Sequence, residues 1–486
     1  MISRIYRESL GLLTDVYQLT MIYGYWKKGI NNKEACFDLF FRENPFQGSY
    51  AVSCGLEYVI DYLKNVKFTS EDIKYLKNLK TDNGEYLFDD KFLQFLKQFK
   101  FKCNIDAIEE GRLVFPHEPL IRITGPLYQC QLLETPLLNM INFQTLIATK
   151  ASRMYLVAGD DPILEFGLRR AQGFDGALAA SRAAFIGGCS KTSNLLAGKL
   201  FGIPVSGTHS HSWVLSFDSE EEAFRSYSEV MPDNCILLVD TYDTIKGVKN
   251  AIRIAKELKK KGKKLIGIRI DSGDLAYLSN KARQLLDQEN LQEVKIFASN
   301  ALDEHVLTTL KNQKSKISFW GIGTKLVTAY DQPSLEAVYK LSAIKDTNGH
   351  WVKKLKLSEQ KNKINNPGVL QVRRFRKDDR FYGDMIYEIN SDSDNTIMVD
   401  PNDQTKSKTF SYDIFDHEDL LKPIFSNGQC VYNAPSIFDM KSNLLKELTF
   451  LDNSIKRLYN PHIYPVGLEQ SLYETKTSMI LELRSK

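Results

Sequence analysis

The sequence lacks the features that mark several classes of protein. Its 486 residues include seven cysteines, and no two stand three positions apart, which excludes a C-x-x-C pair for zinc or redox chemistry. Their odd number and scattered positions favour reduced thiols in a cytoplasmic protein. No run of about 18 apolar residues occurs, and residues 1–20 have no apolar signal-peptide core. We therefore expect no membrane span and no export.

A strong charge of either sign is also missing. The 64 basic and 60 acidic residues leave a net charge of +4, which is too weak to indicate a nucleic-acid partner. Hydrophobic residues make up 43% of the chain and charged residues 26%, as in ordinary globular proteins. A chain of this length can bury large cores and is expected to form two or three domains.

The two ends of the chain carry mixed patterns. Within residues 1–150, apolar spacing predicts helices over 15–28 and 136–157, and amphipathic helices in the lysine-rich stretch 67–102. Residues 346–486 lose any regular repeat. We expect a mixed C-terminal region that packs on an N-terminal α+β domain.

The middle of the chain, residues 151–345, is more regular. Four apolar strands are predicted, each followed by a small polar cluster, at residues 235–239, 265–270, 294–298 and 317–321. Helices are predicted at 244–261 and 275–288, which is the βα repeat of a parallel sheet. Three earlier strands are predicted at 162–166, 185–187 and 204–207. About seven strands favour an α/β barrel, whose chemistry lies at the carboxyl ends of its strands.

The last predicted strand ends in a glycine-rich segment. Gly321 and Gly323 let backbone N–H groups approach a phosphate, and Thr324 adds a hydroxyl. A tight turn would use the same residues. The motif alone is therefore balanced between a phosphate site and a turn.

A sharper pattern surrounds Arg269 and Asp271, which stand two apart on one strand and face the same way. The arginine can grip a carboxylate in a bidentate pair, and the aspartate can bind ribose hydroxyls or Mg²⁺. Ser272 and Gly273 then begin a helix, where an anion can bind. A buried ion pair with a helix cap is the structural alternative. The functional interpretation is favoured over this alternative, because a buried arginine seldom lacks a partner.

Two histidines follow the predicted strand 204–207. Neutral His209 or His211 can serve as a metal ligand, a general base or a nucleophile toward phosphorus. With no cysteine or glutamate nearby, they make a poor zinc site. Arg169 and Arg170 follow an earlier strand, which indicates either an acidic ligand or a surface ion pair. These residues together indicate an enzyme that acts on a sugar phosphate.

Five longer motifs occur in order along the chain. They are LTDVYQLTM (13–21), EFGLRRAQGFDGALAASRAAFIGG (165–188), TSNLLAGKLFGIPVSGTHSHSW (192–213), GIRIDSGDL (267–275) and GIGTKLVTAYDQPSLEAVYKL (321–341). Together they resemble the nicotinate phosphoribosyltransferase family. The resemblance implies an irregular TIM-like α/β barrel beside an α+β sandwich-like domain built from the N- and C-terminal segments. It implies that nicotinate and 5-phosphoribosyl 1-pyrophosphate form nicotinate mononucleotide and pyrophosphate in NAD salvage, with ATP hydrolysis and Mg²⁺.

The resemblance also implies roles for individual residues. His211 matches the histidine that ATP phosphorylates, and Arg269 matches the arginine that holds the nicotinate carboxylate. Phe166 matches the aromatic residue that stacks on the pyridine ring, while Thr208 and Tyr17 match further nicotinate contacts. In the family this tyrosine comes from the partner subunit, which implies a homodimer with shared active sites.

A second group of residues is expected at the phosphoribosyl moiety. Arg169 and the catalytic candidate Asp271 match residues that contact it. Gly321, Gly323 and Thr324 match the 5′-phosphate site, and Ser272, Gly273 and Asn300 complete the expected substrate site. His209 stands where relatives often carry other residues, so it receives no role. The ligands of Mg²⁺ are not assigned.

Three positions depart from the family pattern. Residues 189–191 (Cys-Ser-Lys) stand where an acidic residue is expected, Phe174 replaces proline, and Ala301 replaces aspartate. Lys191 and Arg269 favour a carboxylate substrate over an amide, so nicotinamide phosphoribosyltransferase is the less favoured activity on the same fold. Quinolinate phosphoribosyltransferases are much shorter. A non-catalytic nucleotide-binding relative, or a different sugar-phosphate barrel enzyme such as an aldolase, would also be compatible with parts of the pattern.

Overall fold

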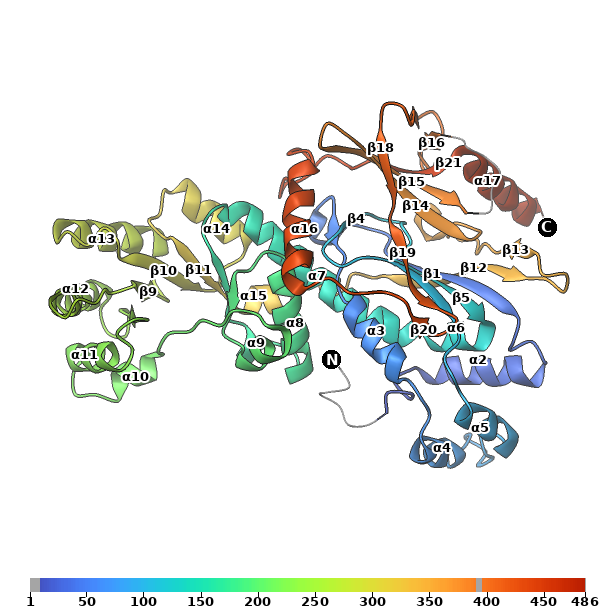
Figure 1. The fold of residues 1–486 in the computed structure, drawn as a ribbon, viewed down its shortest axis with the longest axis horizontal. Helices are drawn as coiled ribbons and strands as arrows, with labels where there is room; N and C mark the ends of the chain where they lie inside the picture. Colours follow the sequence, from blue (N-terminus) through green and yellow to red (C-terminus); the bar gives the residue numbers. More distant parts are fainter. Residues whose placement is uncertain (1–8, 390–395, 486) are drawn as a thin grey trace. The chain divides into compact units, whose positions relative to one another are not determined.

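The computed structural model describes residues 9–389 and 396–485, and the chain divides into two compact units (Figure 1). Unit 1 combines the described residues up to Leu146 with those from Ser334 onwards, and unit 2 is Ile147–Pro333. Unit 2 ends at Pro333 rather than at residue 345, because β12 (Val338–Lys345) pairs with β1 (Glu34–Phe40) in unit 1.

Unit 2 is built on a six-stranded parallel sheet. Its strands are β6 (Ile163–Glu165), β7 (Lys191–Thr192), β8 (Ile236–Leu238), β9 (Gly267–Ile270), β10 (Lys295–Asn300) and β11 (Phe319–Ile322). Their order is β7-β6-β11-β10-β9-β8, and each neighbouring pair is parallel. Five of these strands match predicted ones. The parallel arrangement brings the carboxyl ends of the strands to one edge of the sheet.

Two of the predicted strands differ from the structure. The strand predicted at 185–187 is wrong, because these residues complete and follow α8 (Phe174–Ile186). A short apolar run does not separate a strand from a buried helix, and the preceding alanines extend the helix through it. The strand predicted at 204–207 is reduced to a single bridge between Val205 and Thr192.

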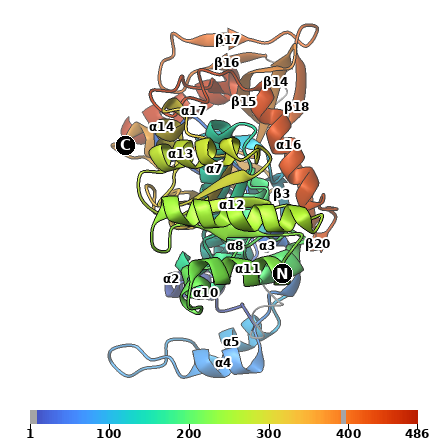
Figure 2. The ribbon, with the colours of Figure 1, turned by 90° about the vertical axis from the view of Figure 1, so that its left-hand side faces the viewer.

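Helices follow the strands of unit 2. α12 (Thr244–Lys260), α13 (Leu275–Gln288) and α14 (Glu304–Asn312) each begin after an aspartate whose carboxylate accepts a backbone N–H of the first turn. Figure 2 shows α12 between α13 and α11 (Glu220–Val230). The remaining helices are η2 (Leu168–Arg170), α9 (Leu195–Phe201), α10 (His211–Leu215) and α15 (Thr324–Val327), while α7 (Glu134–Ala158) continues from unit 1 into unit 2.

The described residues of unit 1 form two large sheets and one small one. Its further strands are β2 (Ala51–Val52), β3 (Asn104–Ile108), β4 (Leu113–Val114), β5 (Ile121–Pro126), β13 (Trp351–Lys353), β14 (Leu370–Lys377), β15 (Arg380–Glu388), β16 (Ile397–Val399), β17 (Ser407–Thr409), β18 (Asp416–Asp419), β19 (Leu421–Ser426), β20 (Gln429–Cys430) and β21 (Val466–Glu469). The sheet orders are β13-β12-β1-β5-β3-β19-β20, β17-β16-β21-β15-β14-β18 and β2-β4. The first sheet therefore interleaves N-terminal and C-terminal strands.

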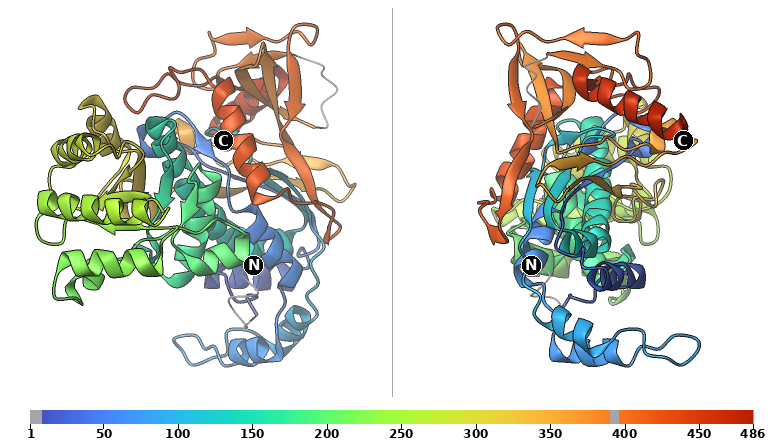
Figure 3. Two further views of the ribbon diagram at one scale, coloured as in Figure 1. Left: turned by 60° about the vertical axis from the view of Figure 1, so that its left-hand side comes forward. Right: turned by 90° about the vertical axis from the view of Figure 1, so that its right-hand side faces the viewer.

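Besides α7, which matches the helix predicted at 136–157, unit 1 contains helices at the other positions predicted from apolar spacing. The described helices of this unit other than α7 are α2 (Val16–Lys27), η1 (Pro45–Gln47), α3 (Leu56–Asn65), α4 (Ser70–Lys77), α5 (Asp90–Lys97), α6 (Leu127–Leu132), η3 (Lys361–Lys363), α16 (Ile437–Phe450) and α17 (Gln470–Ser485). The segment with α4 and α5 extends away from the sheets of this unit (light blue in Figure 3). In the described part of the chain, no helix combines the length and apolar character that a membrane crossing requires.

Candidate functional site

Polar side chains at the carboxyl ends of β8, β9 and β10 form one hydrogen-bonded group. Asp240 Oδ2 accepts the backbone N–H of Asp271 at 2.9 Å and the hydroxyl of Ser272 at 2.7 Å. The Ser299 hydroxyl donates to the other end of the group, at Asp271 Oδ1. The three strand ends are thus bonded together at Asp271, whose backbone is held by Asp240 and whose carboxylate is held by Ser299.

Arg269 joins this group to the segment that carries the histidines. Its Nη1 donates to Thr208 Oγ1 at 2.6 Å, and its Nη2 donates to the carbonyl of His209 at 3.3 Å. Its Nε is buried and has no hydrogen-bond partner among the described residues. Burial lowers the pKa of Arg269, whereas Asp271 and Asp240 raise it. A half-buried cation with a donor to spare is suited to an anionic substrate group.

His211 begins α10 and faces the same strand ends. Its Nδ1 lies 3.2 Å from the hydroxyl of Thr241, and its Nε2 lies 3.9 Å from Asp271 Oδ2. The side chain of His211 is 40% exposed, whereas His209 is buried at 7% exposure. A ligand can therefore reach the imidazole of His211 far more easily than that of His209.

Phe166 packs against the glycine-rich segment after β11. Its ring lies on a buried cluster of Leu164, Ile236 and Phe297. A Cβ atom at residue 321 would lie 2.8 Å from this ring, and one at residue 323 would lie 3.2 Å from the Phe166 carbonyl oxygen. Gly321 and Gly323 therefore make room for Phe166, a reason for glycine that phosphate binding alone does not supply.

The remaining predicted residues of unit 2 are accessible to solvent. Arg169 is exposed in η2 and lowers the pKa of Arg269 by charge repulsion. Thr324 is exposed at the start of α15. Gly273 has φ +78 at the turn before α13, and Asn300 has φ +121 at the end of β10. That conformation is rare outside glycine, and such strain is concentrated at functional sites.

Tyr17 belongs to unit 1 and lies on α2. Its side chain is 47% exposed. Partial burial, followed by the nearby charge of Glu134, raises the pKa of Tyr17 to about 12, so the phenol stays protonated at neutral pH. It can therefore donate a hydrogen bond or offer the face of its ring.

Among the residues of this site, Asp240 and Asp271 have carboxylates that could hold Mg²⁺. No group of three or more His, Cys, Asp or Glu residues is arranged around a metal position in residues 9–389 and 396–485. Asp240 Oδ1 is buried without a hydrogen-bond partner in these residues. Mg²⁺ is commonly held by one or two carboxylates together with substrate phosphates and water. The two aspartates fit an ion that binds along with its substrate.

Three residues of the site were missed by sequence reasoning. Asp240 orients Asp271, and Thr241 contacts His211. Glu165, which is buried, accepts the backbone N–H of Gly167 and so fixes the chain beside Phe166. Asp240 and Thr241 lie in a polar cluster that follows a predicted strand, which is the same signal that identified Asp271.

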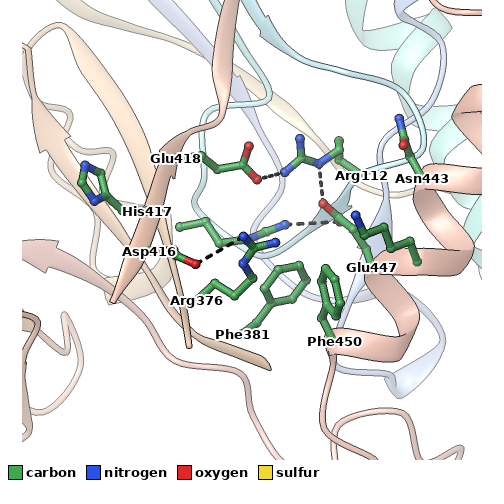
Figure 4. Close-up of a pocket in the computed structure, with 11 residues that line it drawn as sticks. Arg112, Arg376, Phe381, Asp416, His417, Glu418, Asn443, Glu447 and Phe450 are labelled. Carbon is green, nitrogen blue, oxygen red and sulfur yellow. Dashed lines mark hydrogen bonds and ion pairs between the residues drawn. The ribbon is translucent and has the colours of Figure 1, made fainter. Parts of the chain in front are cut away.

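A pocket of about 240 Å³ lies in unit 1 and contains none of the predicted site residues (Figure 4). Figure 4 shows Arg112 between Glu418 and Glu447, with ion pairs to both. Arg374 pairs with Glu447 at 3.3 Å, and Arg376 pairs with Asp416 of β18 at 3.4 Å. Because each of these three arginines is paired with a carboxylate, we interpret this pocket as part of an ion-pair network that stabilises unit 1.

Comparison with known proteins covers nearly the whole chain. Family models match in order: the nicotinate phosphoribosyltransferase N-terminal domain at residues 12–142, the nicotinate phosphoribosyltransferase family at 162–377 and the C-terminal domain at 370–476. The nicotinate phosphoribosyltransferase of Bacillus subtilis is 44% identical over 99% of this chain and 97% of its own. That of Caenorhabditis elegans is 34% identical over 95% and 92%. The crystal structure of human nicotinic acid phosphoribosyltransferase matches with 30% identity and a TM-score of 0.83, over 96% of this chain and 99% of that chain.

Proposed function

Because the chain belongs to the nicotinate phosphoribosyltransferase family, we propose that it couples its reaction to ATP hydrolysis through phosphorylation of His211. The chain is a phosphoribosyl transfer enzyme of NAD salvage that acts on nicotinate. The observation that carries the ATP step is the placement of His211. Its accessible imidazole lies beside Thr241 and Asp271, and Asp271 stands two residues after the arginine proposed to hold the substrate.

The proposed nicotinate site combines one cation with two aromatic rings. Arg269 binds the carboxylate, and Thr208, which accepts a hydrogen bond from Arg269, borders the ring. The pyridine ring stacks between Phe166 and Tyr17 of the partner subunit. Orienting the weak ring nitrogen toward the anomeric carbon is the main contribution of these contacts, because the reaction must otherwise wait for a rare encounter.

The proposed phosphoribosyl site lies at the neighbouring strand ends. Gly321, Gly323 and Thr324 bind the 5′-phosphate, with Arg169, Ser272, Gly273 and Asn300 as further contacts. Loss of pyrophosphate develops positive charge at the anomeric carbon, which the Asp271 carboxylate can stabilise. Mg²⁺, held by Asp240 and Asp271, would neutralise charge on the pyrophosphate.

The proposed ATP step uses His211 as a nucleophile. An imidazole nitrogen attacks the γ-phosphorus of ATP, the bond to the bridging oxygen breaks, and ADP leaves. Water later cleaves the phosphorus–nitrogen bond, which releases phosphate and restores the imidazole. The phosphoryl group adds negative charge and acceptor oxygens beside Asp271 and Thr241. This change would organise the Mg²⁺ complex of the cosubstrate and tighten its binding.

We further propose that unit 2 is an irregular TIM-like barrel and that unit 1 is its sandwich-like partner domain. One segment of chain supports the barrel. The backbone N–H of Thr192 in β7 donates to the Pro204 carbonyl at 3.0 Å, and the backbone N–H of Leu238 in β8 donates to the His209 ring at 3.1 Å. Residues 204–209 therefore bond to both end strands of the sheet. A cytoplasmic homodimer that shares its active sites completes the proposal, with the scattered and mostly buried cysteines as support for the compartment.

Substrate choice gives the first test. Purified protein supplied with nicotinate, 5-phosphoribosyl 1-pyrophosphate and ATP should form the mononucleotide. The value of kcat/KM for nicotinamide should be roughly 100-fold lower, because the amide leaves the Arg269 cation unpaired. Chromatographic product assays with both pyridines, with and without ATP, measure this directly. Equal rates for the two pyridines would reject the proposed specificity.

Replacing Arg269 tests the carboxylate contact. Arg269→Ala should raise the KM for nicotinate at least about tenfold, since a charge-assisted bidentate pair is lost. Arg269→Lys should recover part of the loss, because lysine keeps the charge without the fork of donors. Arg170→Ala is the matched control, since this exposed arginine has no assigned role. A nicotinate KM that is unchanged in Arg269→Ala would contradict the assignment.

A further inference from the structure

We propose that His209 is a positioning residue, which ties the segment carrying Thr208 and His211 to strand β8 and so holds Arg269 in place for nicotinate. The inference rests on the proposed function, because it concerns the same substrate site. It assigns a task to the histidine that the family resemblance leaves without one.

Both nitrogens of the His209 ring bond to the backbone. Nε2 lies 3.1 Å from the backbone nitrogen of Leu238 and accepts its N–H. A nitrogen that accepts cannot carry a proton, so in the neutral ring the proton is on Nδ1. That nitrogen lies 3.2 Å from the carbonyl oxygen of Ser210, to which it donates. The hydrogen bonds therefore specify one neutral tautomer.

The surroundings of the ring favour the neutral form as well. Tyr227 packs edge-on against His209 at 4.7 Å between ring centroids, and Phe224 lies at 6.1 Å. Burial lowers the pKa of His209 to about 4, although the hydrogen bond to Ser210 opposes the shift. At the pH of an enzyme assay the imidazole is thus uncharged and remains an acceptor.

The His209 ring accepts a backbone N–H of β8 that no neighbouring strand accepts. β8 is an end strand of the sheet, and Leu238 stands opposite Arg269 in the pairing of β8 with β9. Leu238 is completely buried, so water does not satisfy its backbone N–H. The imidazole takes the place that a further strand would occupy. Without it a buried donor would lack a partner, which is costly.

The hydrogen bonds of His209 complete a ring of contacts that begins and ends at Arg269. The guanidinium donates to Thr208 and to the backbone carbonyl of His209. The ring of His209 is bonded to Leu238, and Leu238 is paired with Arg269 itself. The Thr208 hydroxyl also donates to the His209 carbonyl at 3.2 Å. Moving the ring would therefore move both acceptors of the guanidinium.

The same bonds exclude His209 from the chemistry of ATP. A nucleophile needs a free lone pair that faces the ligand, and both nitrogens of this ring are committed to backbone groups. His211 differs, because its ring bonds to a hydroxyl and its Nε2 lies 3.9 Å from a carboxylate. His211 therefore acts on the substrate, whereas His209 positions the residues that bind the substrate.

The test compares two replacements of similar size. His209→Leu keeps bulk but removes the acceptor, and His209→Gln offers an amide oxygen near the position of Nε2. His209→Leu should raise the KM for nicotinate about tenfold, with a smaller change in kcat and in the KM for 5-phosphoribosyl 1-pyrophosphate. ATP-dependent labelling of His211 should persist. His209→Gln should recover at least half of the logarithmic loss.

A second measurement uses no substrate and so separates this inference from the proposed function. Hydrogen exchange followed by mass spectrometry should show faster exchange of the peptide containing Ile236–Leu238 in His209→Leu, and near-normal exchange in His209→Gln. Unchanged exchange in His209→Leu, or a nicotinate KM within twofold of the parent, would overturn the inference. Loss of His211 labelling as complete as in His211→Ala would also overturn it, because it would indicate a direct role in phosphorylation.

Discussion

Replacing His211 by alanine is expected to abolish ATP-dependent phosphorylation of the protein. Among the described residues, the variant loses the only accessible imidazole beside Asp271 and Thr241, and the phosphorus–nitrogen bond then has no histidine nucleophile there. ATP should fail to stimulate mononucleotide formation, and the rate with ATP should fall to the rate without it. Labelling with γ-³²P-ATP under alkaline conditions, which preserve phosphohistidine, measures the first effect, and the product assay measures the second.

His350→Ala is the matched control for this experiment. The His350 side chain is 81% exposed in unit 1, and its Nδ1 lies 3.9 Å from Asp346 Oδ2. Labelling of this variant should equal that of the parent, as should labelling of His209→Ala. Persistent labelling of His211→Ala together with loss in His209→Ala would reverse the assignment of the two histidines.

A second large effect is expected on stability, at Arg374 in unit 1. Its side chain is 1% exposed, and Nη2 lies 2.6 Å from Asp384 Oδ2, which is itself fully buried. Nη2 also donates to the Leu113 carbonyl at 2.8 Å. Arg374→Leu would leave the Asp384 and Glu447 carboxylates without this cation. Breaking a buried pair in this way costs about 3–5 kcal/mol, which should appear in the unfolding transition of unit 1.

Arg376 provides the control on the same strand. Its ion pair with Asp416 spans 3.4 Å, and the partner carboxylate is 77% exposed. Arg376→Leu should therefore change the free energy of unfolding by less than about 1 kcal/mol. Urea titrations of both variants, monitored by circular dichroism, give the comparison. Similar losses in the two variants would show that the buried network does not stabilise unit 1 in the way inferred.

Local sequence determined much of unit 2. The helix predicted at 275–288 coincides with α13, because its apolar spacing and the Asp274 cap agree on the same start. The strands that end at Asp240 and Asp271 were also predicted, since buried parallel strands are short, continuous apolar runs. Family membership, too, was evident from ordered motifs and is confirmed by the comparisons.

The pairing of strands that lie far apart along the chain could not be predicted from local sequence. β1 takes its neighbour β12 from about 300 residues further along the chain, and β3 pairs with β19 in the same way. No local pattern specifies partners that lie so far apart in the sequence, so these pairings were not predicted. The predicted strand at 185–187 failed for a related reason, because the same apolar residues satisfy a buried helix.

His209 and His211 show the difference between what local sequence specifies and what the fold specifies. The sequence by itself determined that His209 and His211 stand among small polar residues in a phosphoribosyltransferase motif, after a segment predicted as a strand that the structure reduces to a single bridge. Only the tertiary structure decided that His209 turns inward to the N–H of Leu238, while His211 faces Asp271. Residues two apart have the same local chemistry, and their difference comes from what the fold brings to each ring. β8 presents to one histidine a buried N–H that no neighbouring strand pairs, and the neighbouring strand end presents a carboxylate to the other.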